Sequence, residues 1–276
     1  MTSVDAPLAS QQPAFSWLRV RTVVRRHAYV LWRSPHRWFD IVVWPLFDVL
    51  LWGSLGAFVA QENDASRAGV PYLLAGIMLF HVLFQSQIAV STGFMEETWT
   101  RNLLNMMTTP LREIEYVVGL AVYGLAKLAA AMAMVCLTAV TFYGFGLGEV
   151  GWGLVPIVGI LMVIGWALAM LVVGLLLRYG QSAEILAWAS TFLILSLSGV
   201  FNPVSAIPGV LQPLARILPT TYVFSAARDL LDGKAMPWGD IGWGAVGAVV
   251  LVVLSTTFVT RKLAQFRQRG YVTRYS

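Results

Sequence analysis

Long apolar stretches alternate with short polar ones along almost the whole chain. The apolar stretches fall at residues 39–60, 71–94, 116–145, 152–177, 183–200 and 241–260. Each has about 18 to 30 residues, which is enough for a helix to cross a bilayer core of about 30 Å. None shows the strict alternation of apolar and polar residues that a membrane barrel needs. The pattern therefore predicts an all-α membrane protein with six transmembrane helices.

The composition agrees with this prediction. Of the 276 residues, 58% are hydrophobic and 12% are charged, whereas about one quarter of a soluble domain is charged. A single cysteine, Cys136, excludes an intrachain disulfide and a metal site with several cysteine ligands. Residues 1–16 are polar and lack the apolar core of a signal peptide, so we expect them to form a flexible N-terminal tail.

Basic residues gather before the first apolar stretch and after the last. Those before it are Arg19, Arg21, Arg25, Arg26, Arg33 and Arg37, and those after it are Arg261, Lys262, Arg267, Arg269 and Arg274. Because basic residues remain on the cytoplasmic side, both termini are predicted to be cytoplasmic, which requires an even number of spans. This placement accounts for most of the net charge of +5 without a nucleic-acid partner.

Residues 17–37 form the second predicted segment, an amphipathic helix at the membrane surface. Apolar residues alternate there with arginines at roughly helical spacing: Trp17, Val20, Val24, Tyr29 and Trp32. Such a helix lies with its apolar side in lipid and its arginines toward head groups or a partner. Ser34-Pro35 is expected to break it. The pattern leaves open whether this helix is a passive anchor or docks a partner.

A short charged segment separates the second and third apolar stretches. It reads EETWTRNLLNMMTTPLRE from Glu96 to Glu113, and the predicted topology makes it cytoplasmic. We expect a helix of about 13 residues that ends before Pro110, with its two leading acids in the first turn. Glu97 and Arg101 are then one turn apart and can pair. An apolar stripe along this helix comprises Trp99, Leu103, Leu104, Met106 and Met107.

The segment between the fifth and sixth stretches is unusually rich in proline. Between residues 200 and 238 lie Pro203, Pro208, Pro213, Pro219 and Pro237, which are too many for one continuous helix. The apolar residues instead predict two helices of about ten residues, over 211–218 and 222–231, the second ended by Gly233. We expect both to dip into the outer leaflet and return.

Three features together resemble the permeases of type-2 ABC exporters. They are the basic surface helix with WRSPHRWF, the acidic pair followed by MTTPLRE, and the outer segment from Ser198 to Gly233. The resemblance runs in order from about Phe15 to Lys262. It implies a domain of six spans over residues 38–262 and a basic cytoplasmic tail over 263–276, in the inner membrane of a bacterium.

The resemblance also implies partners. Such a permease works as a dimer, with a second copy or a paralogous permease, under two ABC ATPase subunits that are separate chains. The residues expected to contact the ATPase are Glu96, Glu97, Trp99, Arg101, Leu103, Leu104 and Met107. The chain has no GxxxxGK[ST] phosphate-binding loop, so we expect the partner to hydrolyse ATP and this chain to hold no cofactor and no metal.

Ionisable residues within the apolar stretches are few. Asp48, His81 and Lys127 are the most deeply placed, and a lone charge there costs about 2.5–3.5 kcal/mol on insertion scales. Asp48 is therefore expected to face protein or water, either in a contact with His81 or Lys127 or as a polar point in a translocation path. Phe201, Tyr222 and Phe224 are candidates for lining an exit, with Arg216 or Arg228 near the polar end of the cargo.

Other functions fit the sequence less well. No GxSxG elbow or cluster of histidines supports an enzyme. An ion-driven carrier would need more charge along one path through the membrane. The apolar spans favour a cargo with an apolar part, such as a drug or a lipid. A lipid-linked glycan is the alternative.

Overall fold

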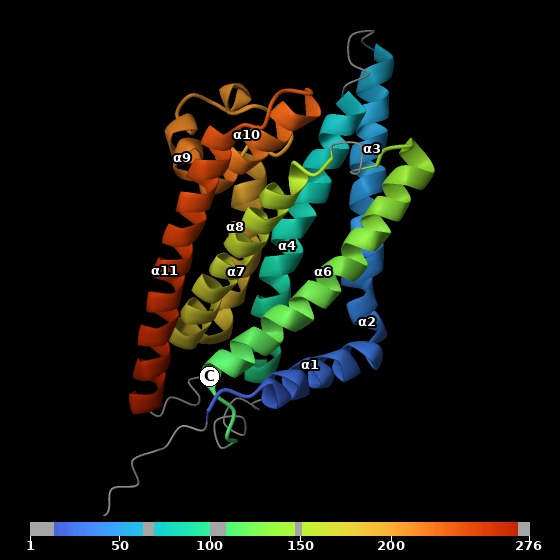
Figure 1. The fold of residues 1–276 in the computed structure, drawn as a ribbon. Helices are drawn as coiled ribbons and strands as arrows, with labels where there is room; N and C mark the ends of the chain where they lie inside the picture. Colours follow the sequence, from blue (N-terminus) through green and yellow to red (C-terminus); the bar gives the residue numbers. More distant parts are fainter. Residues whose placement is uncertain (1–13, 63–68, 100–108, 147–150, 270–276) are drawn as a thin grey trace, which may run out of the picture.

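The computed structural model describes residues 14–62, 69–99, 109–146 and 151–269. Within these ranges all regular structure is helical and no strand occurs (Figure 1), so the predicted all-α class is confirmed. The helices in chain order are α1 (Trp17–Trp32), α2 (Pro35–Trp38), the π-helix η1 (Phe39–Val43), α3 (Trp44–Glu62), α4 (Gly69–Trp99), α6 (Glu113–Tyr143), α7 (Leu154–Tyr179), the 3-10 turn η3 (Gly180–Ala183), α8 (Glu184–Leu197), the 3-10 turn η4 (Val204–Ala206), α9 (Gln212–Ile217), α10 (Pro219–Leu231) and α11 (Trp238–Arg269).

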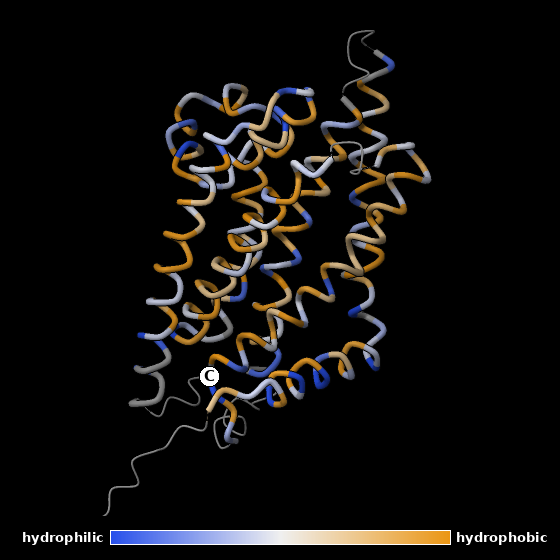
Figure 2. Tube along the Cα trace, viewed as in Figure 1, coloured by the Kyte–Doolittle hydropathy of each residue, from blue (hydrophilic) through white to orange (hydrophobic). Residues whose placement is uncertain are grey.

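Five of the described helices are long and apolar enough to cross a membrane: α3, α4, α6, α7 and α11. Hydrophobic residues follow these helices, and hydrophilic ones gather in α1 and toward the two ends of the bundle (Figure 2). In lipid a helix satisfies its own backbone hydrogen bonds, which explains why the apolar stretches are helical.

The fifth apolar stretch differs from its prediction. Residues 183–200 were expected to form a full span, but α8 has only 14 residues, or about 21 Å of helix. Glycines with positive φ stand near both ends, Gly180 at 69° and Gly199 at 68°. Gly180 ends α7 and is followed by the turn η3, and Gly199 lies just after the end of α8, so the apolar run is longer than the helix it contains.

The helices form a bundle with distinct ends (Figure 1). Helix α1 lies across one end, and α9 and α10 cover the other. Helix α11 returns the chain to the end occupied by α1. It continues to Arg269, so residues 263–269, predicted to belong to a basic tail, extend the last helix.

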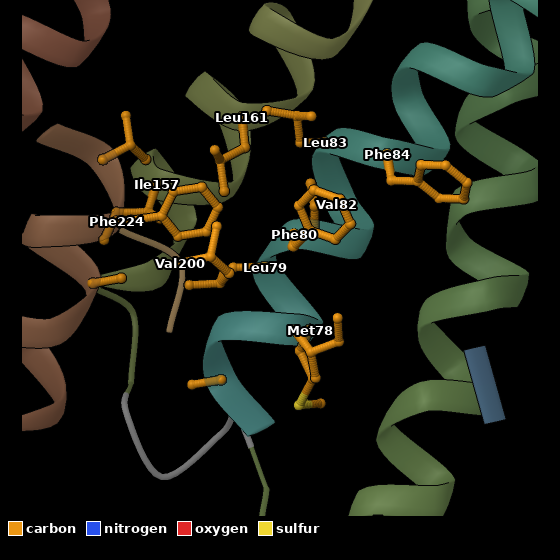
Figure 3. Packing of buried hydrophobic residues seen from close by; sticks show 14 of the residues in the cluster. Met78, Leu79, Phe80, Val82, Leu83, Phe84, Ile157, Leu161, Val200 and Phe224 are labelled. Carbon is orange, nitrogen blue, oxygen red and sulfur yellow. The ribbon is translucent and has the colours of Figure 1, made fainter. Parts of the chain in front are cut away.

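Helix α4 is the centre of the bundle. In its most apolar 18-residue window, 94% of the residues are buried, against 22% in the corresponding window of α11. Its apolar residues pack against α7 and α10, where Leu79 lies near Ile157, Val200 and Phe224 (Figure 3). A helix with apolar residues on every side suits this enclosed position.

Small residues let neighbouring helices approach α4 closely. A Cβ at Gly165 of α7 would lie 2.6 Å from the carbonyl oxygen of Leu83, and one at Gly124 of α6 would lie 2.9 Å from Cβ of Ala89. Side chains at these positions would separate the helices. In lipid, where apolar surface alone gives little driving force, such close packing is a main source of helix association.

A buried hydrogen-bond group joins α4 to α8. Nε2 of Gln87 donates to the carbonyl of Ala187 at 2.8 Å and to Oγ of Ser190 at 3.0 Å, while Oγ1 of Thr191 donates to Oε1 of Gln87 at 2.8 Å. Gln87 is fully buried. These bonds fix the rotation of the short helix α8 against α4, since an unpaired amide in this place would be costly.

The junction between α2 and α3 is a π-helix. At its end the N–H of Trp44 donates to the carbonyl of Phe39, five residues back. Pro45 follows at once, and a proline ring clashes with the carbonyl four residues before it. The wider π register relieves this clash and redirects the chain from the surface helices into α3.

Two short helices, α9 and α10, occupy the proline-rich segment between α8 and α11, in agreement with the two helices predicted there. Pro219 begins α10, and Gly233 follows its end with φ 70°. Oγ1 of Thr221 donates to the carbonyl of Ala215 at 2.5 Å, and the hydroxyls of Ser198 and Thr220 are 2.5 Å apart. These contacts tie the two helices to each other and to the end of α8.

The packing of α7 on α4 generates a test with a matched control. Gly165→Ala should destabilise the protein by about 1–3 kcal/mol, because the added methyl group meets backbone. Gly159→Ala, in the same helix, should have little effect, because a Cβ there has open space around it. Unfolding of the purified proteins in detergent measures both. Equal stabilities for the two variants would contradict close packing at Gly165.

Candidate functional site

The end of the bundle that carries α1 holds the densest group of ion pairs in the described part of the chain. Nε of Arg19 donates to Oε2 of Glu115 at 2.6 Å, and its Nη2 donates to Oε1 at 2.6 Å. The backbone N–H groups of Ser16 and Arg112 donate to the same carboxylate at 2.7 and 3.0 Å. The carboxylate hydrogen-bonded to Arg19 raises the pKa of that guanidinium above its usual value.

Two further pairs join the surface helices to the end of α4. Nη1 of Arg26 lies 2.6 Å from Oε1 of Glu97, and Nη2 donates to Oε2 at 2.8 Å. From α2, Nη1 of Arg37 donates to Oε2 of Glu96 at 2.8 Å. The paired carboxylates thus stand on both sides of residues 100–112, two at the end of α4 and one at the start of α6.

The buried side chain of His27 lies next to the Arg26–Glu97 pair. Its Nδ1 is 3.0 Å from the carbonyl of Val23, which can only accept, so Nδ1 carries the hydrogen. Its Nε2 is 3.8 Å from Oε1 of Glu97. The buried ring contacts Tyr123 of α6, with 5.4 Å between ring centres. His27 therefore fills the junction of α1, α4 and α6.

This geometry corrects the prediction for the acidic pair. Glu96 and Glu97 were expected in the first turn of a separate helix, but α4 continues without a break to Trp99 and places them in its last turns. No proline interrupts the chain between the apolar stretch and the acids, so the helix does not end there. Carboxylates are unfavourable near a helix C-terminus, and the arginines of α1 and α2 offset that cost.

The other residues expected to contact an ATPase are only partly covered by the structure. Helix α4 ends at Trp99. Arg101, Leu103, Leu104 and Met107 lie outside the described residues, as does the expected Glu97–Arg101 pair. Glu97 is almost fully buried, so its side chain is engaged within this chain.

The deepest predicted polar residues meet inside the bundle. Nε2 of His81 lies 3.1 Å from Oδ2 of Asp48, and the exposed fractions of the two side chains are 0% and 21%. The contact joins α3 to α4, as the interhelical interpretation expected. The relative orientation of the two groups is poor for a hydrogen bond, which leaves both ring nitrogens without one among the described residues.

Aromatic contacts involve residues near this pair, since Trp52 lies one turn after Asp48 in α3 and the ring of Phe84 is 6.1 Å from that of His81. Trp52 of α3 stacks on Phe201 with 3.8 Å between ring centres, and Phe84 of α4 contacts Trp188 of α8 at 5.9 Å. One of the predicted exit residues, Phe201, thus packs on α3. The sequence did not single out Trp52, Phe84 or Trp188, because aromatic residues at helical spacing are common in membrane helices.

The other two predicted exit residues have different surroundings. Tyr222 is half-buried, and its hydroxyl donates to the carbonyl of Arg216 at 2.9 Å. Phe224 is 2% exposed, and its ring lies beside Ile157 and Val200 in the core (Figure 3). Phe224 therefore does not line an open surface of the single chain, contrary to its expected position.

Arg228 also differs from its expected place near a cargo. Its guanidinium donates to the carbonyl of Gly199 in the turn after α8, and burial lowers the pKa of Arg228. This hydrogen bond stabilises the turn at Gly199. Arg216 is exposed at the end of α9.

Sequence reasoning missed the roles of Arg19, Arg26 and Glu115. The arginines were interpreted as topology signals, which do not require specific partners. Glu115 is the one available clue, because an acid three residues after Arg112 and close after a proline is typical of a helix start.

The contrast between Phe224 and Tyr222 gives a second test. Phe224→Ala should destabilise the protein by about 3–5 kcal/mol, because it empties a filled core position. Tyr222→Phe should cost at most about 1 kcal/mol, because it removes one partly exposed hydrogen bond. Thermal unfolding in detergent measures both. A stable Phe224→Ala protein would mean that this ring lines a surface after all.

Comparison with known proteins agrees with the resemblance noted from the sequence. A search among curated proteins returned no match. The family model described as "ABC-2 type transporter" matches residues 19–231. This range includes the paired arginines of α1 and α2, the central helix α4, the start of α6, and the short helices α9 and α10. This domain is a membrane permease and not a nucleotide-binding domain, and the family normally works with an ATPase subunit. The chain belongs to the ABC-2 type transporter family.

Proposed function

We propose that this chain is the membrane-spanning subunit of an ATP-driven exporter, energised by separate ATPase subunits. The observation that carries the proposal is the pairing of Glu96, Glu97 and Glu115 with arginines of the surface helices. These pairs hold both ends of the segment that resembles a coupling helix. A segment whose ends are fixed in this way can pass a force from a docked partner into α4 and α6.

In this proposal the apolar side chains between positions 99 and 107 form the face that docks on the ATPase. Trp99, Leu103, Leu104 and Met107 would enter a groove of the ATPase, with Arg101 beside them. The chain has no phosphate-binding loop of its own, which supports a partner that hydrolyses ATP. Two ATPase subunits would act on two permeases, either two copies of this chain or one copy with a paralogue.

The side of α4 between α3 and α8 is the best candidate for the cargo path. It carries the Asp48–His81 pair, with the Trp52–Phe201 and Phe84–Trp188 contacts around it. An ionisable residue at this depth is a functional candidate by default. Aromatic rings around a single polar point suit an amphipathic drug or lipid, with Tyr222 farther along at the outer end. A lipid-linked glycan is the second candidate, and an ion-driven carrier has less support.

In the proposed orientation the α1 end is cytoplasmic, in the inner membrane of a bacterium. The arginines of α1 and the basic residues at the end of α11 lie at this same end, which suits the positive-inside rule. The helices α9 and α10 then face the outside.

Docking can be tested at Leu103. Leu103→Asp should leave membrane insertion intact and should strongly reduce co-purification of a co-expressed ATPase subunit, because it places a charge in the docking face. Pull-down with a tagged permease measures this, and Thr22→Ala on the exposed side of α1 is the control. Normal co-purification with Leu103→Asp would contradict the docking assignment.

Orientation can be tested by chemical labelling. In a Cys136→Ala background, Arg25→Cys at the α1 end should be protected from an impermeant thiol reagent in intact cells. Asp232→Cys at the opposite end should react. Both positions are exposed in the structure, so the side of the membrane, and not burial, decides which cysteine is labelled. The reverse pattern would overturn the proposed orientation.

A further inference from the structure

The arginines of the surface helices divide into two groups. Arg19, Arg26 and Arg37 each pair with a glutamate of α4 or α6. Arg25, on the same helix as the first two, contacts Tyr29 and has no carboxylate within 4 Å among the described residues. General attraction to lipid head groups would not require this division. The paired arginines also join the surface helices to α4 and α6.

Helix α1 is joined to its two neighbours by different means. Against α6 it packs tightly, since a Cβ at Gly119 would lie 2.7 Å from Cβ of Val23. The contacts with α4 are made by charged side chains. Arg26 and His27 of α1 contact Glu97, and Arg37 of α2 contacts Glu96. The connection from α4 to the surface helices therefore depends largely on charge.

The Arg37–Glu96 pair has a special position in the chain. Arg37 precedes η1 by only two residues, and α3 follows η1 directly. A short π-helix is rare and is a common place for a bend in a helix. A displacement of the end of α4 would thus reach the start of α3 through this pair, in addition to the direct packing of α3 on α4.

We infer that the Arg37–Glu96 pair, supported by Arg26–Glu97, links the movement of the end of α4 to α3 through the π-helix η1. This inference rests on the proposed function, which supplies the ATP-driven movement. Arg37 and Glu96 are positioning residues: they touch neither cargo nor nucleotide. Helix α3 carries Asp48 and Trp52, so its movement would change the side of α4 that is the candidate cargo path.

The pair is well suited to substitution. Its two side chains are 22% and 24% exposed, so a reversed charge can be solvated and need not prevent folding. Arg37→Glu breaks the pair by repulsion, and Arg37→Glu with Glu96→Arg restores it in the opposite sense. Arg25→Gln is the matched control, because it removes an arginine of α1 that has no glutamate partner among the described residues.

Hydrogen–deuterium exchange of the permease in nanodiscs measures the link in two ways. In the permease alone, Arg37→Glu should raise exchange at residues 39–43, and the double variant should return it to the wild-type level. In the complex with its ATPase, ATP and vanadate should change exchange at residues 94–97 and 39–43 in the wild type. Arg37→Glu should keep the change at 94–97, lose that at 39–43, and still co-purify the ATPase.

The outcomes separate this inference from the proposed function. Unchanged exchange at 39–43 in Arg37→Glu alone, failure of the double variant to restore it, or an equal effect of Arg25→Gln would overturn the link. A wild-type complex that responds at 94–97 but not at 39–43 would also overturn it. If no ATPase binds the wild-type permease, the proposed function fails, and the measurements on the permease alone still decide whether the pair controls η1.

Discussion

The enclosure of α4 is the constraint on which the rest of the structure depends. Nearly all of its apolar window is buried, while α3 and α11 expose most of theirs. A helix can be surrounded in this way only if its neighbours approach closely, and Gly165 of α7 and Gly124 of α6 provide that approach. Several elements with a proposed function contact α4: α3 through Asp48, α8 through Gln87, and the surface helices through Glu96 and Glu97.

Polar groups inside the bundle fall into two kinds. The Gln87 group is fully hydrogen-bonded and joins α4 to α8 in one rotational setting. The Asp48–His81 pair is less complete, since the carboxylate is partly exposed and the ring nitrogens lack hydrogen bonds within the described chain. A satisfied network makes a structure rigid, whereas an incomplete one can accept a new partner. This difference is why the cargo path is proposed at Asp48 and not at Gln87.

The charged end of the bundle has two proposed roles: it orients the protein in the membrane, and it transmits movement from the ATPase. In the proposed orientation this end is cytoplasmic, and three of its arginines pair the acids at the ends of α4 and α6. Under the proposed function these arginines orient the protein, and Arg37 connects a docked ATPase to α3. The Arg37–Glu96 pair is partly exposed, and breaking such a pair costs less stability than breaking a buried one, so its contribution would be visible in movement more than in folding.

The sequence by itself determined the helical class, five of the six predicted spans as long apolar helices, the amphipathic helix with its break before Pro35, and the two short helices α9 and α10, because apolar run length, proline and glycine act locally. It did not determine that α8 is short, that α4 continues through Glu96 and Glu97, or that Phe224 is a core residue. The burial of Phe224 depends on which helices meet. Arg19 could be assigned to Glu115 only after folding brought residues 96 positions apart into contact, and no local pattern carries that information. The tertiary structure alone decided which charges are paired and that α4 is the enclosed helix, since both follow from the packing of helices distant in the chain.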